Sequence, residues 1–428
     1  MKPAILFIAA VLPAAADTTA PNTPVPAAPT LPAAPQNTAD GYEFPVALSA
    51  SRLLGSDAAG ADYRVREQVP TDGYMAHFTI DSDYGTFQCV GETQARARIA
   101  ELEAIRKLVS VSRSDLFAEG VKRSIEQPID AVKNIAQDPV GSAKAVPKTI
   151  GHLFKKVGRS VENAAKNVHE KIESGDSSGM GSGIGNAAKG VIGFDQAKLD
   201  CAKQLQVDPY TDNERLQEEM EKVTWVFFSG GMPLRIGAMA ASGGASMALT
   251  ATKVVGLPDE MYTSTPSELA LRDQQAMEAL SVPEAVIRKY QSNEALSITL
   301  RRSIIKSLAA LGNPQGSAGV LTVAANCEAR RQSEFIDQAL RLLAARKQAG
   351  QLDLAHLEII GRLPGAVDKA GLLHIPAPVD YLTWTSDVAA FANRDDLVGR
   401  KPQLLTRAGM SERARAELGK LGWTVAAP

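Results

Sequence analysis

The chain has 428 residues, which is enough for roughly two or three domains of ordinary size. Its hydrophobic fraction of 45% and charged fraction of 22% are typical of folded globular proteins. A formal net charge of −2 excludes a general electrostatic attraction to nucleic acid, so any charged partner must be contacted locally.

The N-terminus has the three parts of a secretory signal peptide. Lys2 supplies the positive charge, Ile5–Leu12 forms a short apolar run, and Ala14–Ala16 offers a small-residue cleavage site. The apolar run is too short to span a bilayer comfortably. The sequence therefore predicts that residues 1–16 direct export to the periplasm or cell envelope; the alternative is a buried N-terminal strand or helix.

Two stretches have the composition of linkers. Residues 17–41 alternate alanine, threonine and proline, which favours an extended chain without a core of its own. Residues 173–186 are rich in glycine and serine. The second stretch superficially resembles a phosphate-binding loop, but it lacks both the G-x-G-x-x-G register and a following Gly-Lys-Ser/Thr, so we interpret it as a linker.

Residues 42–112 are predicted to form a small α+β unit. Alternating apolar residues predict strands at Tyr63–Val69, Tyr74–Ile80 and Thr86–Val90, arranged as an antiparallel meander. Apolar residues at helical spacing predict that Thr93–Ser110 forms a helix covering this sheet.

Residues 113–172 carry the most regular pattern in the chain. Within Ser124–Ile172, lysines and two sets of apolar residues recur every eleven residues. Eleven residues over three turns is about 3.67 per turn, close to the α-helical period, so the pattern predicts helices with one straight apolar stripe. Pro128, Pro139 and Pro147 are expected to divide the segment into shorter helices.

The same segment is basic. Lys122–Lys171 contains ten Lys or Arg and five Asp or Glu residues. In period and charge placement the segment resembles the eleven-residue repeats of apolipoprotein-like and synuclein-like lipid-surface helices, and a basic amphipathic helix can lie on an anionic membrane. The candidate surface-binding residues are Lys133, Lys144, Lys148, Lys155, Lys156, Arg159, Lys166, Leu153, Phe154 and Val157.

The apolar stripe has other possible partners. It could pack on the chain itself, on a second copy or on an envelope protein, because each of these would cover it equally well. Binding to nucleic acid is not expected, since the segment lacks an array of stacking aromatic residues and its lysines are interspersed with acids.

Residues 187–350 are predicted to form a helical domain. After a helix at Ala187–Leu205, Asp212 could cap a second helix. The buried face of that second helix would contain Leu216, Met220, Val223, Thr224 and Phe227.

Further helices are predicted over Thr265–Gln348. Thr265–Glu268 and Ser281–Glu284 each match a capping box. Leu296–Leu311 and Gly319–Lys347 show helical apolar periods, and the short connections suggest an antiparallel array.

A stretch rich in small residues lies inside this domain. Val223–Leu234 and Ile236–Thr252 could form a hydrophobic hairpin in which glycine and alanine let two helices approach closely. A membrane-inserting or toxin-like protein that uses residues 223–252 is therefore one alternative function. Arg235 and the many small residues instead favour a pair of helices packed inside the protein.

Residues 351–428 are predicted to be a mixed α/β region. His356–Arg362 and Leu372–Ile375 are expected to be hairpin strands flanking Pro364-Gly365, followed by a helix containing Trp384. The final strand, helix and strand are predicted to form a parallel pair with a crossover, over Gln403–Thr406, Ser411–Leu421 and Trp423–Ala426.

Familiar catalytic and metal-binding motifs are missing from the sequence. Gly244–Ala248 approaches G-x-S-x-G but lacks the last glycine, and His169-Glu170 is not followed by the second histidine of H-E-x-x-H. No catalytic, cofactor-binding or metal-ligating residue is assigned, and no cofactor is expected. An unrecognised periplasmic enzyme with a cleft between the sheet unit and the helical domain is a further alternative.

The chain contains three widely spaced cysteines, Cys89, Cys201 and Cys327. An oxidising compartment would permit one intramolecular disulfide, and the sequence does not select the pair. The alternative is that all three are small buried apolar side chains.

Four short motifs carry a likeness that spans most of the chain beyond the signal peptide. They are Asp138–Val140, Asp208–Tyr210, Pro378–Trp384 and Gly422–Val425. With the order of the parts, they resemble an uncharacterised family of exported bacterial proteins. The resemblance implies this organisation and no particular activity.

Together these features predict an α+β fold that is predominantly α-helical. Its expected parts are a small antiparallel sheet unit, an amphipathic helical segment, a helical array and a short mixed α/β C-terminal part. The favoured function is an exported, non-enzymatic binding protein of the cell envelope. It would contact an anionic membrane surface or a partner protein through its basic amphipathic segment. The sequence leaves the oligomeric state and the identity of a partner open.

Overall fold

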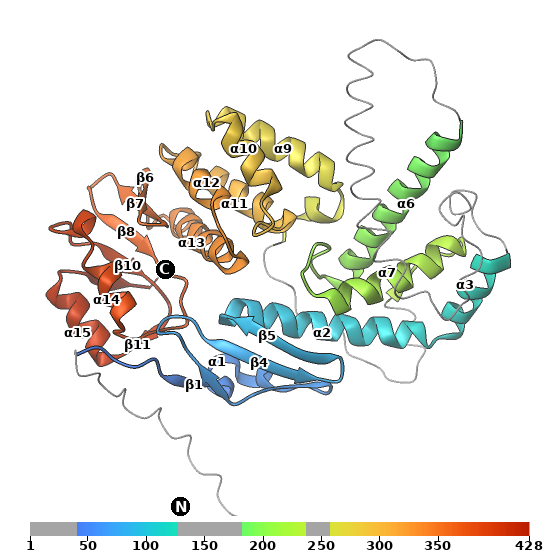
Figure 1. Ribbon diagram of the computed structural model, residues 1–428, viewed down its shortest axis with the longest axis horizontal. Helices are drawn as coiled ribbons and strands as arrows, with labels where there is room; N and C mark the ends of the chain where they lie inside the picture. Colours follow the sequence, from blue (N-terminus) through green and yellow to red (C-terminus); the bar gives the residue numbers. More distant parts are fainter. Residues whose placement is uncertain (1–40, 127–181, 237–256, 428) are drawn as a thin grey trace, which may run out of the picture. The chain divides into compact units, whose positions relative to one another are not determined.

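The computed structural model describes residues 41–126, 182–236 and 257–427 (Figure 1). Helices predominate in these residues and are accompanied by small sheets. This confirms the predicted α+β fold that is predominantly α-helical.

The N-terminal part has the predicted antiparallel meander. Its strands are β2 (Tyr63–Val65), β4 (His77–Ser82) and β5 (Gly85–Val90), in the order β2-β4-β5. Helix α2 (Glu92–Ser112) packs on β4 and β5, as predicted. It buries Ile99, Leu102, Ile105 and Leu108.

The prediction of one strand over Tyr63–Val69 was wrong. The chain bends after β2, and β3 (Gln68–Pro70) pairs with β1 (Ala47–Ser49), which leads into the short helix α1 (Ala50–Leu54) and the 3₁₀ turn η1 (Gly55–Ala58). Val65 and Val69 are both buried, while Arg66 between them pairs with exposed Asp81. The bend thus lets Val65 and Val69 contribute from two separate sheets to the same core.

Three helices extend this core. They are α3 (Asp115–Glu126), α6 (Ser182–Leu205) and α7 (Glu214–Ser229), and α7 contacts α2, α3 and α6. Helix α6 begins before the predicted Ala187, so the predicted Gly/Ser linker at 173–186 ends inside a helix.

Helix α7 has the buried face that its spacing predicts. Leu216, Met220, Val223, Thr224 and Phe227 are all buried. Its cap is Asn213, whose side chain accepts from the Leu216 N–H at 3.3 Å, and not the predicted Asp212. The Asp212 carboxylate is instead drawn to two arginines from other helices.

The first arm of the predicted hydrophobic hairpin therefore packs on the protein core through Val223, Val226 and Phe227, and residues 237–252 of its second arm lie outside the described residues. Among the helices that the structure describes, none has the length and apolar character needed to cross a bilayer.

The second group of helices follows the 3₁₀ turn η2 (Asp259–Tyr262). They are α9 (Pro266–Ala279), α10 (Glu284–Ser292), α11 (Ile298–Ala310), α12 (Ser317–Ala325) and α13 (Arg330–Gln348). The capping box of Thr265 and Glu268 is present, with proline in the first turn. The second predicted box is absent, because Pro283 occupies the N-cap of α10 and offers no side-chain acceptor.

The predicted helix Gly319–Lys347 is two helices. The chain breaks between α12 and α13, where the Asn293 amide donates to the carbonyl oxygens of Ala325 at 3.2 Å and Cys327 at 2.9 Å. These bonds satisfy carbonyl groups that a continuous helix would have satisfied itself.

The C-terminal part contains a five-stranded sheet in the order β12-β10-β8-β7-β6. The strands are β6 (Leu354–Ile360), β7 (Leu363–Asp368), β8 (Leu373–Pro376), β10 (Gln403–Leu405) and β12 (Thr424–Ala426). β10 and β12 are parallel and are joined through α15 (Glu412–Lys420), as predicted.

Two details of this part differ from the prediction. The hairpin turn is at Gly361-Arg362, where Gly361 has φ +63°, and Pro364-Gly365 lies inside β7. The helix expected to contain Trp384 begins after it, as α14 (Ser386–Ala392). The 3₁₀ turn η3 (Asp395–Leu397) follows, and a small parallel pair, β9 (Tyr381–Leu382) and β11 (Gly409–Met410), completes the region.

The two ends of the described chain are bonded together. Buried Glu43 accepts from the Trp384 N–H at 2.7 Å and from the Ser411 hydroxyl. The Thr383 N–H donates to the Gly73 carbonyl at 2.8 Å. The motif Pro378–Trp384 thus attaches the C-terminal part to the turn before β4.

All three cysteines are buried and free. Burial raises the pKa of Cys89 to about 11 and that of Cys201 to about 12. Of the two alternatives left open by the sequence, the structure has the one in which the cysteines are buried side chains.

Candidate functional site

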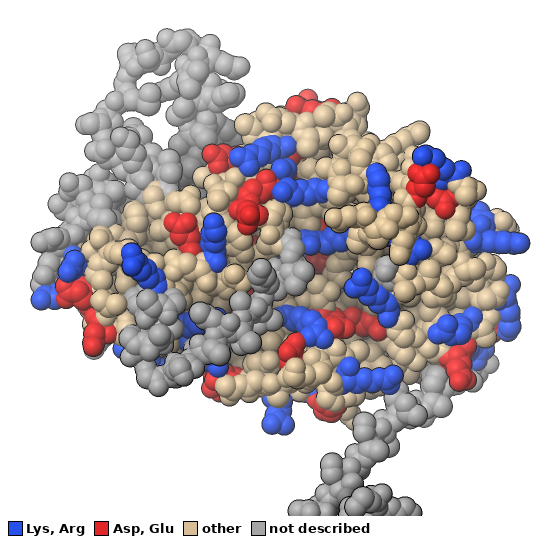
Figure 2. All heavy atoms as spheres, turned by 180° about the vertical axis from the view of Figure 1, so that it is seen from behind, with Lys and Arg blue, Asp and Glu red and all other residues tan. Residues whose placement is uncertain are grey.

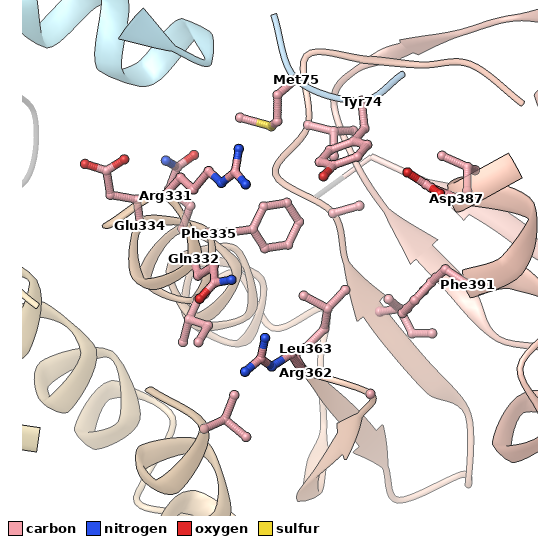
Figure 3. Close-up of a pocket in the computed structure, with 18 of the residues that line it drawn as sticks. Tyr74, Met75, Arg331, Gln332, Glu334, Phe335, Arg362, Leu363, Asp387 and Phe391 are labelled. Carbon is pink, nitrogen blue, oxygen red and sulfur yellow. The ribbon is translucent and has the colours of Figure 1, made fainter. Parts of the chain in front are cut away.

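A cavity of about 520 Å³ lies where three parts of the chain meet (Figure 3). Its walls come from the turn at Asp72–Met75, from the N-terminal half of α13, and from the C-terminal sheet with α14. The volume is within the range of about 300–1,000 Å³ that small-molecule sites have. The cavity lies between the sheet unit and the helical domain, where the enzyme alternative expects a cleft.

The first wall depends on a tight turn. Asp72 Oδ1 accepts from the backbone N–H groups of Tyr74 at 3.2 Å and Met75 at 2.8 Å, which closes the turn. Gly73 has φ +106°, and a Cβ there would lie 2.7 Å from Thr385 Cγ2. Glycine therefore permits both the backbone conformation and the close approach that bring Tyr74 and Met75 to the cavity.

Helix α13 supplies the second wall. Arg331, Phe335 and Gln338 recur at helical spacing on the cavity side, while Leu340 and Leu343 lie in the core and are buried. Figure 3 shows the Phe335 ring directed from α13 into the cavity.

The third wall is apolar. Leu363, Ile375 and Leu404 come from neighbouring strands β7, β8 and β10, and Val388 and Phe391 come from α14. The Phe391 ring packs against that of Trp423, with centroids 6.3 Å apart. Together with Phe335 and Met75, these side chains make the interior of the cavity predominantly apolar.

Charged side chains are placed around this apolar interior. The acids are Asp72, Glu334 and Asp387, and the bases are Arg331, Arg362 and Arg394. Equal numbers of acids and bases leave the lining with no net formal charge, so the availability of each group depends on its partners.

Several of these charges are committed to protein partners. Asp72 Oδ2 lies 3.2 Å from His77 Nε2, and Arg394 makes two bonds to Asp396 at 3.0 and 2.8 Å. Glu334 Oε1 accepts from Arg330 Nε at 2.8 Å.

Arg331 and Arg362 are the less engaged cations. Among the described residues, Arg331 has no carboxylate oxygen within 4.0 Å, and the nearest ion pair of Arg362 is to Glu328 at 3.8 Å. That separation is beyond hydrogen-bonding distance. Both arginines are exposed and can therefore contact a bound molecule.

The titratable groups on the cavity wall do not form an activated nucleophile. Burial raises the pKa of the Cys327 thiol, and Arg362 opposes this only in part. Burial and then Asp72 raise the pKa of Tyr74. Both groups are therefore protonated at neutral pH, the form in which a thiol is a poor nucleophile.

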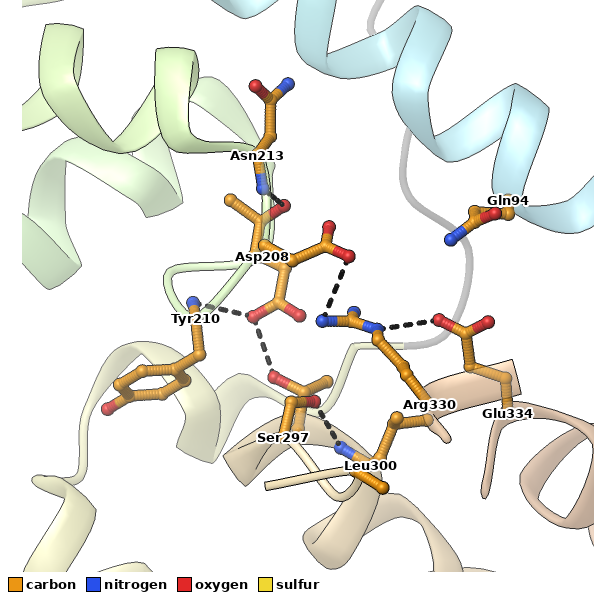
Figure 4. Close-up of polar contacts among 12 residues, drawn as sticks. Gln94, Asp208, Tyr210, Asn213, Ser297, Leu300, Arg330 and Glu334 are labelled. Atoms are coloured by element: carbon orange, nitrogen blue, oxygen red, sulfur yellow. Dashed lines mark hydrogen bonds and ion pairs between the residues drawn. The ribbon is translucent and has the colours of Figure 1, made fainter. Parts of the chain in front are cut away.

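A partly buried ionic network lies behind the cavity wall (Figure 4). Arg330 Nη1 is 3.2 Å from Asp212 Oδ2, and Arg98 Nη2 is 2.8 Å from Asp212 Oδ1. Because Arg330 also holds the cavity residue Glu334, the network connects α13 to α2 through the turn before α7.

Glu101 forms the deepest part of this network. It accepts from Arg98 Nη1 at 2.8 Å, from Asn213 Nδ2 at 2.9 Å and from the Thr211 hydroxyl. Burial raises its pKa, and Arg98 opposes this shift. The full complement of donors accounts for a buried carboxylate at this position, so it has a structural explanation.

Asp208 holds the other side of the same turn. Its Oδ1 atom accepts from the Tyr210 N–H at 2.9 Å and from the Thr299 hydroxyl at 2.7 Å. The Asp208–Tyr210 motif therefore joins α6 and α7 to α11, a long-range role that its sequence does not indicate.

The candidate surface-binding residues of the basic segment, Lys133 to Lys166, all lie outside the described residues. Over the described part of the chain, acidic and basic side chains are interspersed on the face shown in Figure 2. No group of three or more His, Cys, Asp or Glu side chains in the described ranges is arranged to hold a metal ion.

Sequence reasoning missed the cavity. Its lining comes from segments near residues 72, 331, 363 and 391, which are far apart in the sequence. The helical spacing of Arg331 and Phe335 was available as a signal, since it places a large aromatic side chain away from the main apolar stripe.

Comparison of the chain with protein-family models, curated proteins and solved structures finds no match. The site must therefore be interpreted from its own geometry.

Proposed function

We propose that this protein is an exported binding protein of the cell envelope that holds an apolar molecule in the cavity between the Asp72–Met75 turn, α13 and the C-terminal sheet. The observation that supports this is a cavity of about 520 Å³ with a predominantly apolar interior and charges at its edge. Sites of this kind bind small apolar molecules because burial removes apolar surface from water on both partners.

Binding is favoured over catalysis by the state of the polar groups. The lining residues Cys327 and Tyr74 are both held in their protonated forms. Asp72 and Glu334 are occupied by protein donors. A wall with apolar contacts and few uncommitted polar groups can retain a ligand but offers little acid–base chemistry.

The proposed export and membrane contact rest on patterns in the sequence. The signal peptide would bring the chain to the envelope, and the basic segment at 113–172 would attach it to an anionic membrane surface or to a partner protein. A membrane is also a source of apolar molecules for the cavity, so the two predicted activities would act together.

The proposal is tested by titrating the full mature chain with the neutral fluorescent probe N-phenyl-1-naphthylamine. We expect saturable binding that Val388→Trp weakens at least tenfold, because the larger ring occupies space beside Phe391. The matched control is Leu271→Trp, whose wild-type side chain is exposed on α9 and does not line the cavity.

Thermal unfolding of both variants shows whether they remain folded. Absence of saturable binding by the wild-type chain, or equal binding by folded Val388→Trp, would contradict the proposal.

A further inference from the structure

We infer that the cavity selects a single-chain carboxylic acid, with the carboxylate at Arg362 and Gln332 and the apolar chain beside Phe335. This inference rests on the proposed function and specifies the ligand class. The observation behind it is that two side chains with free donor groups, Arg362 and Gln332, lie at one end of a cavity whose interior is predominantly apolar (Figure 3).

Arg362 is presented by the turn between β6 and β7. The two-residue connection fixes its backbone at the edge of the cavity. Its nearest carboxylate, on exposed Glu328, is 3.8 Å away, so the five N–H donors of the guanidinium are not taken up by that acid. A guanidinium can form two parallel hydrogen bonds with a carboxylate.

Gln332 is oriented by its own helix terminus. Its Oε1 atom accepts from the Glu328 N–H at 2.8 Å. This bond identifies the other end of the amide as the NH₂ group, which has two donors and lies on the cavity side. Gln332 and Arg362 therefore both offer donors, which suits an anion.

The opposite end of the cavity is less suitable for an anion. Asp72, Arg331 and Asp387 all act on the Tyr74 hydroxyl there, so that end of the lining holds two acids and one base. At the Arg362 end, Arg394 makes two hydrogen bonds to Asp396. The acid nearest to Arg362 is Glu328 at 3.8 Å, which leaves the Arg362 donors without a hydrogen bond to an acid.

The charge balance also favours a monoanion. The cavity lining has equal numbers of acids and bases, so a dianionic phosphate would introduce one charge more than Arg362 can offset. The apolar chain of the ligand would extend past Phe335 toward Leu363 and Phe391, which supply the interior surface.

The experiment compares dodecanoate, dodecanol and dodecylamine as competitors of the neutral probe on the full mature chain. We expect dodecanoate to bind about tenfold more tightly than dodecanol, as one charge-assisted hydrogen-bonded pair would produce. The preference should decrease with added salt, because Arg362 is exposed.

Arg362→Gln should abolish the preference for dodecanoate and leave dodecanol binding unchanged, which also shows that the variant is folded. Arg288→Gln is the matched control and should retain the preference, because Arg288 is exposed on α10 and does not line the cavity. Equal binding of the three competitors, a preference for the amine, or loss of the preference in Arg288→Gln would overturn the inference while the proposed function stands. Failure of every competitor to bind would instead overturn the proposed function.

Discussion

The carboxylate of Asp380 caps α2 across the fold: its Oδ1 atom accepts from the Glu92 N–H at 3.0 Å. Its other oxygen accepts from the Ala76 N–H at 2.8 Å. One side chain of the C-terminal part thus satisfies a free amide at a helix start and secures the turn that leads into β4. The cavity wall formed by Tyr74 and Met75 depends on this attachment.

Asp380→Ala should therefore lower the free energy of unfolding by about 1–3 kcal/mol, because two backbone donors lose their acceptor. It should also weaken probe binding in the cavity. Denaturant titration measures the first effect and fluorescence the second. Asp353→Ala is the control, since its ion pair with Lys369 is exposed and should contribute less than about 1 kcal/mol. Equal midpoints for the two variants would contradict the capping role.

Gly73 and Gly371 provide a test of the close approach at the cavity turn. Both have positive φ, at +106° and +84°, but only Gly73 would bring a Cβ against Thr385. Gly371→Ala should cost roughly 1 kcal/mol from backbone strain alone. Gly73→Ala should cost more and should reduce probe binding, which Gly371→Ala should leave intact. Unchanged cavity binding in Gly73→Ala would show that the turn does not shape the site.

Protonation of Glu260 should account for part of the stability that the protein loses at acidic pH. Burial alone would raise its pKa, but hydrogen bonds from Arg302 and Lys306 prevail and lower the pKa to about 2. Because the folded-state pKa lies below the unfolded value of 4.5, the stabilisation is present above pH 4.5 and is lost as pH falls toward 2.

Glu260→Gln should lower the free energy of unfolding by about 2–3 kcal/mol at neutral pH. It should also make that free energy depend less on pH between 4.5 and 2. Urea unfolding over this pH range measures the effect, with Glu278→Gln on the exposed face of α9 as control. A variant whose stability still falls with the wild-type slope would exclude Glu260 as the source.

The basic segment predicts binding to anionic vesicles that decreases with salt. Lys155→Glu combined with Lys156→Glu should lower flotation with phosphatidylglycerol vesicles at low salt, whereas Lys347→Glu combined with Lys369→Glu should not. Dye leakage that persists at high salt would instead support the membrane-inserting alternative that uses residues 223–252. Flotation that is identical for both double variants would remove the basic segment from the proposal.

Local patterns predicted local structure well. The five residues on the buried face of α7, the capping box of Thr265 and Glu268, and the β10–α15–β12 crossover all follow from spacing over a few residues. Some predictions failed because of residues that are far away in the sequence. Asp212 could have capped α7, but Arg98 and Arg330 hold its carboxylate.

The sequence by itself determined the α+β class and the buried faces of helices such as α2 and α7, because the direction of successive side chains repeats with the backbone period. It did not predict the break between β2 and β3 or the break between α12 and α13. The tertiary structure decided how Tyr74, Phe335 and Arg362 come to line one cavity. This arrangement depends on how α13, β7 and the Asp72–Met75 turn pack together. The spacing of residues within one segment does not determine the distances between these segments.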